Sequence, residues 1–271
     1  MKRLDAIKIG IIGLGTIGHA VASYSMEHYA KQIEVKAALV RNESRDYRLP
    51  ASCLITSDED AFFAEDMDII VEAAGHTAIK KYGVRALHHA SFIVASIGAL
   101  AEENILEDLK ATAVQHRTQL LVPSAAIGGL DRICAMTLEE IDRIELVTRK
   151  PPAAWYGTLA EEKVDLSSVS KPTLIFSGTA NESALLFPES VNVSAALSLA
   201  GIGFKNTHVR VYVDPTVTRN THQIIAEGFA GRIELSLQNT PSANNPKTGY
   251  IVAMSIVKVL RQYTNPFVIG V

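Results

Sequence analysis

The sequence has few of the features that mark several large classes of protein. It contains two cysteines among 271 residues, Cys53 and Cys134, with no CxxC pair and no cluster of cysteine and histidine at zinc spacing. We therefore expect neither a disulfide framework nor a metal site. We also expect the protein to reside in a reducing compartment. Lys plus Arg is 26 and Asp plus Glu is 29, giving a formal net charge of −3. This balance argues against nucleic-acid binding, which usually needs a concentrated basic surface.

Long apolar segments are also missing. The longest stretch without a charged residue, residues 9–26, is interrupted by glycine, histidine and hydroxyl-bearing residues, so no membrane span is expected. The first residues lead directly into a strand-like run, and we expect no signal peptide. Hydrophobic residues make up 48% of the chain and charged residues 20%. This composition is typical of a cytoplasmic globular enzyme or ligand-binding protein with a large core.

The first half of the chain alternates short apolar runs with helical stretches. Such alternation predicts βαβ units and a doubly wound parallel sheet of the Rossmann type. Strands are expected at residues 6–12, 34–40, 68–74, 92–97 and 119–123. A helical stretch is expected after the glycine-containing segment 13–18, to about residue 31, with further helices at 79–90 and at 102–117.

After about residue 130 the pattern changes to alternation between apolar and polar positions. This alternation predicts a mixed or antiparallel sheet with one solvated face. The expected strands are 141–148, 207–213, 222–229 and 232–237, with helices at 183–187, 191–199 and 246–261 and loops at 151–154 and 239–246. The predicted domains are a dinucleotide-binding domain at 1–130, a catalytic and dimerisation domain at 131–245, and a closing helix at 246–271 packed on the first domain.

A glycine pattern, Gly13-Leu14-Gly15-Thr16-Ile17-Gly18, lies between the first predicted strand and the first predicted helix. Gly13 permits the tight turn, Gly15 lets the backbone approach a pyrophosphate, and Gly18 lets the helix pack closely on the sheet. Backbone N–H groups of the first turn, including those of Thr16 and Ile17, then face the phosphates. The pattern therefore predicts a dinucleotide site.

The end of the second predicted strand indicates which nucleotide is used. An acidic residue at that place would accept hydrogen bonds from the ribose hydroxyls of NAD. This chain has Arg41 and Asn42 instead, with Arg45 and Arg48 close by. Because a guanidinium pairs well with a 2′-phosphate, Arg41 admits NADP as well as NAD, although a solvated basic loop would have the same composition.

Two histidines are candidates for acid–base chemistry. His222 lies where a loop enters a strand, in Asn220-Thr221-His222, and His208 has a similar local pattern in Asn206-Thr207-His208. Imidazole titrates near neutral pH and is a common general base. Position alone does not separate the two histidines.

Longer motifs resemble those of the L-aspartate dehydrogenase family, and they extend from the first strand to the last helix. Their order and spacing are more specific than the glycine pattern. They are PSAAIGGLD at 123–131, TRKPP at 148–152, FSGTANESA at 176–184, FP at 187–188, NVSAALSLAG at 192–201, NTH at 220–222, and NTPS with NNPKT at 239–248.

The resemblance implies oxidation of L-aspartate with NAD or NADP to iminosuccinate, which is hydrolysed to oxaloacetate and ammonia or passed to NAD biosynthesis. By motif, His222 corresponds to the family's catalytic histidine, and Ala126 and Asn192 to its cofactor contacts near the nicotinamide. A homodimer is also implied. One position departs from the family, which usually has glycine where this chain has Ala125. If the backbone there is left-handed, alanine is strained.

L-Aspartate carries two carboxylates, so cationic or N–H groups are expected to converge on them. The candidate cations are Lys150, after a predicted strand, and Lys247, at the start of the last predicted helix. Ser124 and Asn220 are weaker hydrogen-bonding candidates, and His222 is the expected base for hydrolysis of the imine. The alternatives are a related two-domain reductase for another small carboxylate, and a catalytically silent sensor of NAD(P).

Overall fold

The computed structural model describes residues 6–187, 191–243 and 245–270, without the side chains of Pro246 and Lys247. The chain forms two compact units. The first unit comprises Met1–Pro123 and Val252–Val271, and the second comprises Ser124–Ile251. The boundaries differ from the predicted 130/131 and 245/246, because the segment after Pro123 and the residues before Val252 belong to the second unit.

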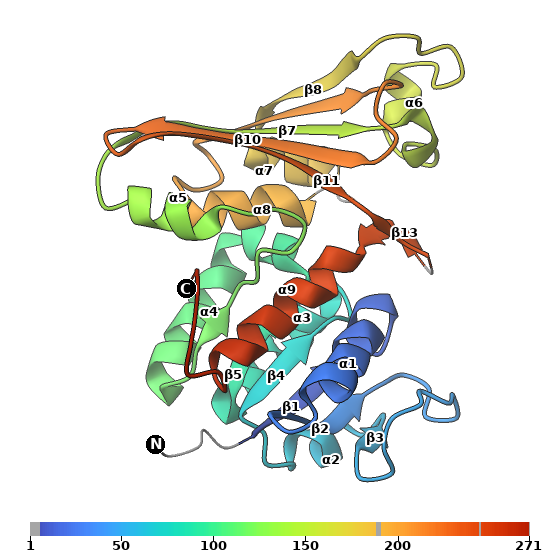
Figure 1. Ribbon diagram of the computed structural model, residues 1–271, viewed down its shortest axis with the longest axis vertical. Coiled ribbons are helices and arrows are strands. Elements are labelled where there is room, and N and C mark those ends of the chain that lie inside the picture. Colours follow the sequence, from blue (N-terminus) through green and yellow to red (C-terminus); the bar gives the residue numbers. More distant parts are fainter. Residues whose placement is uncertain (1–5, 188–190, 244, 271) are drawn as a thin grey trace. The chain divides into compact units, whose positions relative to one another are not determined.

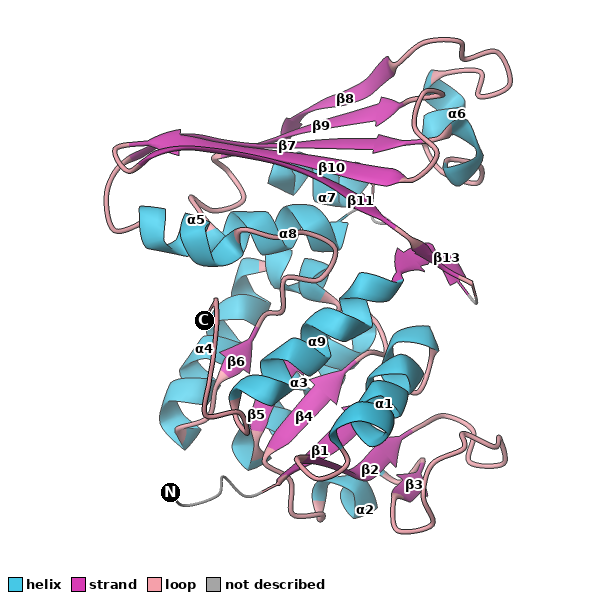
Figure 2. Cartoon of the chain, in the orientation of Figure 1, coloured by secondary structure: helices cyan, strands magenta, loops and turns pink. Residues whose placement is uncertain are grey.

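The described part of the first unit contains a six-stranded sheet in the order β3-β2-β1-β4-β5-β6, and all neighbouring strands are parallel. The predicted doubly wound sheet is confirmed, and Figures 1 and 2 show its strands with helices on both faces. Its central strands are buried on both sides, as continuous apolar runs in a parallel sheet must be. The strands are β1 (Ile7–Ile12), β2 (Ile33–Leu39), β3 (Leu54–Thr56), β4 (Ile69–Glu72), β5 (Ser91–Val94) and β6 (Leu120–Leu121).

Helices from both ends of the chain share one face of this sheet. Val21 and Ala22 of α1 and Ile256 and Leu260 of α9 pack in one core cluster with the strands. The last helix therefore completes the first unit, as predicted. The helices and 3₁₀ turn of this unit are α1 (Thr16–Tyr29), α2 (Glu59–Phe63), α3 (His76–His89), η1 (Ile97–Ala101), α4 (Glu103–His116) and α9 (Tyr250–Gln262).

The described part of the second unit contains a mixed five-stranded sheet in the order β11-β10-β7-β9-β8. Strands β7 and β9 are parallel, and the other neighbouring pairs are antiparallel. Residues alternate between a face covered by α7 and α8 and a second face, as the polar and apolar alternation predicted (Figure 2). The strands are β7 (Ile141–Lys150), β8 (Thr173–Thr179), β9 (Thr207–Val213), β10 (Asn220–Gly228) and β11 (Gly231–Asn239).

Short elements complete the second unit. Prediction from sequence missed β8, α5 and α6, which have only weak apolar periodicity. The capping box of α7, in which Thr179 and Glu182 bind each other's backbone, marks the end of β8. The elements are α5 (Leu130–Met136), η2 (Pro152–Ala154), α6 (Ala160–Lys163), α7 (Ala180–Leu186), α8 (Val191–Ala200), β12 (Pro241–Ser242) and β13 (Asn245–Gly249).

The prediction of a helix from residue 246 was wrong. Residues Asn245–Gly249 form β13, which pairs antiparallel with β12, and α9 begins at Tyr250. The expected loop at 239–246 contains the end of β11 and β12. Two-residue pairing at a sheet edge tolerates proline, which explains why this proline-containing segment still forms strands. Among the described helices, none combines the length and apolar character needed to cross a membrane.

Candidate active site

The glycine turn after β1 has the geometry that a dinucleotide needs. Gly13 has φ +91°, and a Cβ on it would lie 2.7 Å from the Cβ of Ala74. A Cβ on Gly18 would lie 1.9 Å from the carbonyl oxygen of Gly13, so only glycine allows α1 to approach β1 this closely. A Cβ on Gly15 would meet nothing within 4 Å. Gly15 therefore leaves open space where a pyrophosphate would contact the backbone.

The first turn of α1 follows directly. Gly15 is the N-cap and provides no side-chain hydrogen bond, and Thr16 and Ile17 open the 14-residue helix. Their backbone N–H groups have no partner within the helix, so they are suited to a phosphate.

A buried carboxylate that sequence reasoning missed supports the neighbouring turn. Glu72, at the end of β4, is fully buried. Its Oε1 accepts hydrogen bonds from the N–H groups of Ala74 (2.7 Å) and Gly75 (2.8 Å), and Oε2 accepts one from the N–H of Ser96 (3.0 Å). Glu72 thus fixes the turn that faces Gly13. A single charged residue ending an apolar strand is the signal that could have identified it.

A cavity of about 750 Å³ lies in the first unit at the carboxyl ends of β1, β2 and β4. Gly13, Gly15, Arg41, Asn42 and Arg45 are among its lining residues. This is the place where open α/β sheets bind their ligands, and its volume suits part of a dinucleotide. Arg41 is exposed at the wall, where its guanidinium is available to an anion.

The second unit brings several predicted residues together on the covered face of its sheet. His222 on β10 lies directly opposite Thr148 on β7 and Leu237 on β11. One step further along the same face, Asn220 lies opposite Asn239 on β11 and next to Lys150 on β7. We call the row of Lys150, Asn220 and Asn239 the polar row.

His222 is 4% exposed, and its Nδ1 lies 3.1 Å from the Oγ1 of Thr148, which is itself buried. Burial and the positive charge of Lys150 lower the pKa of the His222 imidazole to about 3. The ring is therefore neutral at physiological pH, with one nitrogen able to accept a proton.

Lys150 is a buried cation, 6% exposed. Its Nζ lies 4.6 Å from the ring centroid of Trp155, and the Trp155 indole N–H donates to the Lys150 carbonyl (3.3 Å). Trp155 is fully buried against Phe187. The ammonium group of Lys150 therefore packs against a buried aromatic side chain, which restricts its position.

The segment that follows β6 is hydrogen-bonded to the polar row through Asn239. The Nδ2 of Asn239 donates to the carbonyl of Ala126 (2.8 Å), and the N–H of Ile127 donates to the carbonyl of Ser124 (3.0 Å), closing a turn. Ala125, inside this turn, has φ +50°. The position where the family usually has glycine is therefore left-handed, and alanine is strained there.

Replacing Ala125 with glycine is expected to stabilise the protein by about 0.5–1 kcal/mol, because the relieved strain exceeds the added backbone entropy of the unfolded chain. The expected rise in melting temperature is about 1–4 °C for a chain of this size. Ala126→Gly is the matched control, because Ala126 has no positive φ. That variant should melt lower. Equal changes of melting temperature in the two variants would contradict the claim that Ala125 is strained.

The remaining predicted residues are distributed around this face. Asn192 is half-buried in the first turn of α8, and Ser124 is half-buried in the turn before Ala126. Lys247 lies in β13 rather than at a helix start, and its side chain lies outside the described residues. His208 is exposed on the opposite face of the sheet, 3.3 Å from Ser177, so the fold separates it from the residues near His222.

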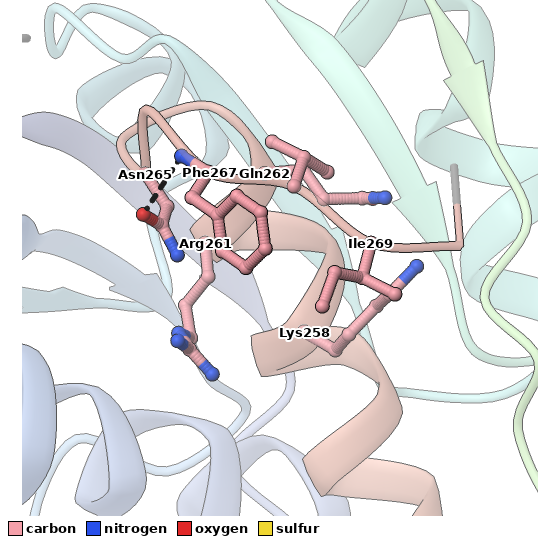
Figure 3. A pocket seen from close by; sticks show the side chains of 7 residues that line it. Lys258, Arg261, Gln262, Asn265, Phe267 and Ile269 are labelled. Carbon is pink, nitrogen blue, oxygen red and sulfur yellow. Dashed lines mark hydrogen bonds between the residues drawn. The ribbon is translucent and has the colours of Figure 1, made fainter.

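A smaller cavity, of about 320 Å³, lies in the first unit between the end of α9 and the C-terminal segment. Figure 3 shows Arg261, Phe267 and Ile269 around it, with Asn265 accepting a hydrogen bond from the Phe267 N–H. It contains none of the predicted site residues. Across the described residues, no group of three or more His, Cys, Asp or Glu is placed to hold a metal ion.

Comparison with known proteins agrees with this geometry. Residues 13–123 match the family model described as the homoserine dehydrogenase NAD-binding domain, which together with the glycine turn and its cavity defines a pyridine-nucleotide-dependent oxidoreductase. Residues 131–263 match the family model described as aspartate dehydrogenase, C-terminal. The chain belongs to the aspartate dehydrogenase family.

Individual relatives match between about three quarters and nearly all of the chain. An L-aspartate dehydrogenase of Methanocella arvoryzae is 36% identical over 97% of this chain and 99% of its own length. That of Ralstonia nicotianae is 41% identical over 73% of this chain and 74% of its own. The fold matches the crystal structure of an aspartate dehydrogenase from Thermotoga maritima with a TM-score of 0.78, at 23% identity, covering 97% of this chain and 99% of that one.

Proposed function

We propose that this protein oxidises L-aspartate with NAD⁺ or NADP⁺, giving iminosuccinate that is hydrolysed to oxaloacetate and ammonia or passed to NAD biosynthesis. Membership of the family supports the reaction. The single structural observation that carries the proposal is the buried Lys150 beside the neutral His222 on one face of the second sheet. A cation next to a neutral base suits a substrate that has carboxylates and must react through a water molecule.

The side chains of the second unit bind and orient the substrate. Lys150 donates to one carboxylate of L-aspartate, and Asn220 and Ser124 supply further hydrogen bonds. Ala126 and Asn192 contact the cofactor near its reactive end. When bound, the nicotinamide supplies the hydride acceptor for the hydrogen on Cα. The substrate reacts as the neutral amine, whose nitrogen lone pair forms the C=N bond and which loses one proton to solvent to give the imine.

His222 then acts on water. It accepts a proton from the water molecule that attacks the imine carbon and returns that proton to the nitrogen of the resulting carbinolamine. Ammonia then leaves as the C–N bond breaks and the C=O bond of oxaloacetate forms. A carboxylate bound beside Lys150 offsets the lysine's positive charge, which is one cause of the low pKa of His222. Substrate binding therefore raises the pKa of the imidazole, which makes it a stronger base, while burial, the larger cause, still holds that pKa below its ordinary value.

The activity is tested by the absorbance of reduced nicotinamide, with L-aspartate as substrate, NAD⁺ and NADP⁺ in parallel, and L-homoserine as control. Reduction that depends on L-aspartate supports the proposal. Reduction with another small carboxylate instead indicates a related reductase. Cofactor binding without oxidation of any amino acid indicates a silent sensor, and either of these last two results would refute the proposal.

Use of NADP⁺ is proposed to depend on Arg41. Arg41→Ala is expected to lower kcat/KM for NADP⁺ by about 10- to 100-fold, the equivalent of a lost charge-assisted hydrogen bond, and to change that for NAD⁺ little. Arg48→Ala is the control, because Arg48 is close in sequence but does not line the cavity. If the two variants have the same cofactor preference, Arg41 does not contact the 2′-phosphate.

We also propose a homodimer formed through the second unit. Its sheet has a face without α7 and α8, on which Tyr212, Arg149 and Gln223 are half-buried. Light scattering during size-exclusion chromatography should give twice the chain mass of 29.3 kDa. A single-chain mass at micromolar concentration would contradict this assignment.

A further inference from the structure

The imidazole of His222 has two nitrogens with different surroundings. Nδ1 faces the hydroxyl of Thr148 at 3.1 Å, and both side chains are buried. The ring can serve as a base only through a nitrogen that lacks a proton. Which nitrogen carries the proton is determined by the hydrogen bond that the other one makes.

Among the residues paired with His222 across the strands of the sheet, Thr148 is its polar neighbour. The residues paired in that row are Val211 on β9, Thr148 on β7, His222 on β10 and Leu237 on β11. On the far side from the polar row, Leu146 and Ile224 form an apolar pair. His222 therefore lies at the border between the apolar core of the second unit and its polar row.

The backbone cannot replace this hydroxyl. Strand β7 lies between β9 and β10, and β10 lies between β7 and β11, so the N–H and C=O groups of both strands are engaged in ladders. In the free protein, a buried ring nitrogen without a partner would cost about 1–3 kcal/mol. A side-chain hydroxyl directly across the strand pair supplies that partner.

We infer that Thr148 is a positioning residue whose Oγ1 accepts a hydrogen bond from the Nδ1–H of His222, leaving the lone pair on Nε2 for the reacting water. This inference rests on the proposed function, since it names the orientation of the base in that reaction. A neutral hydroxyl, unlike a carboxylate, orients the ring without strongly stabilising its protonated form.

The test compares Thr148→Val, which removes the hydroxyl at nearly constant volume, with Thr148→Ser, which retains it. Thr148→Val is expected to lower kcat for the formation of oxaloacetate from L-aspartate by about 10- to 100-fold, the usual effect of losing a group that orients a functional histidine, with KM changed less than about threefold. Thr148→Ser should keep kcat within about threefold of the unsubstituted enzyme. Equal losses in both variants, or a loss confined to KM, would overturn the inference.

Nitrogen NMR of protein labelled in its histidines provides a readout that does not need activity. In the unsubstituted protein the His222 signal, assigned by its absence from His222→Asn, should show a protonated Nδ1 and an unprotonated Nε2. Thr148→Val should shift the ring toward the other tautomer. A protonated Nε2 in the unsubstituted protein would overturn the inference. If L-aspartate is not a substrate, the NMR result still shows whether His222 donates a hydrogen bond to Thr148. Failure of the proposed function can therefore be distinguished from failure of this inference.

Discussion

Replacing His222 with asparagine is expected to lower the steady-state rate at which oxaloacetate and ammonia form from L-aspartate by about two to four orders of magnitude, the usual contribution of a positioned general base. Asparagine retains a polar side chain opposite Thr148 but cannot accept a proton from water near neutral pH. Affinity for NAD⁺ and NADP⁺, measured by nucleotide fluorescence, should be nearly unchanged, because the glycine turn and the cavity that contains Arg41 belong to the first unit.

His208→Asn is the matched control for this substitution. His208 has a similar sequence context, but it is exposed on the other face of the same sheet. Its replacement should leave kcat within about twofold, as is usual for an exposed position away from a site. Full turnover in His222→Asn would show that the base is another residue. A large loss of kcat in His208→Asn would indicate that the reaction takes place on the opposite face of the sheet.

Replacing Lys150 with methionine is expected to raise KM for L-aspartate by about 10- to 100-fold, because a charge-assisted hydrogen bond to a carboxylate contributes about 1.5–3 kcal/mol. Methionine keeps an unbranched side chain against Trp155. The same substitution removes one of the two causes that lower the pKa of His222, so the imidazole pKa of the free protein should rise. Burial, the larger cause, remains.

Steady-state kinetics and an NMR titration of His222 measure the two effects separately. Lys205→Met is the control, because Lys205 is an exposed lysine of the second unit. An unchanged KM for L-aspartate in Lys150→Met would show that Lys150 does not bind the substrate. A His222 pKa that stays at about 3 in that variant would show that burial alone is responsible.

Local patterns were sufficient to predict the glycine turn of the first unit, which lines the cavity at the ends of the strands. Gly13, Gly15 and Gly18 are within six residues of one another, and each acts through the backbone of its own turn. The strand that precedes them is a continuous apolar run, which predicts a buried parallel strand. The order of the long strands and helices followed from the same local periodicity.

Contacts between distant residues could not be predicted in this way. Thr148 and His222 are 74 residues apart, and the contact between Asn239 and Ala126 spans 113 residues. Such pairs depend on strand register, which a single sequence does not specify. The same limitation left His208 and His222 indistinguishable by local pattern, so that only the family resemblance favoured His222; strand pairing then placed the two histidines on opposite faces.

The incorrect start of the last helix has a local cause. Residues 246–261 contain enough apolar positions for a helix, but pairing of β12 with β13 uses the backbone of the first few. Lys247 therefore lies in a strand and not in the helix that the sequence predicted. Tertiary pairing overrode helix propensity at this point.

The most direct test of the proposed site is a crystal structure of the protein with NADP⁺ and succinate, a dicarboxylate without the amine that is oxidised. We expect one succinate carboxylate within hydrogen-bonding distance of the Lys150 Nζ, and the carbon next to the other carboxylate facing the Nε2 of His222. Succinate bound away from both residues, or on the face of the sheet that carries His208, would contradict this assignment of the active site.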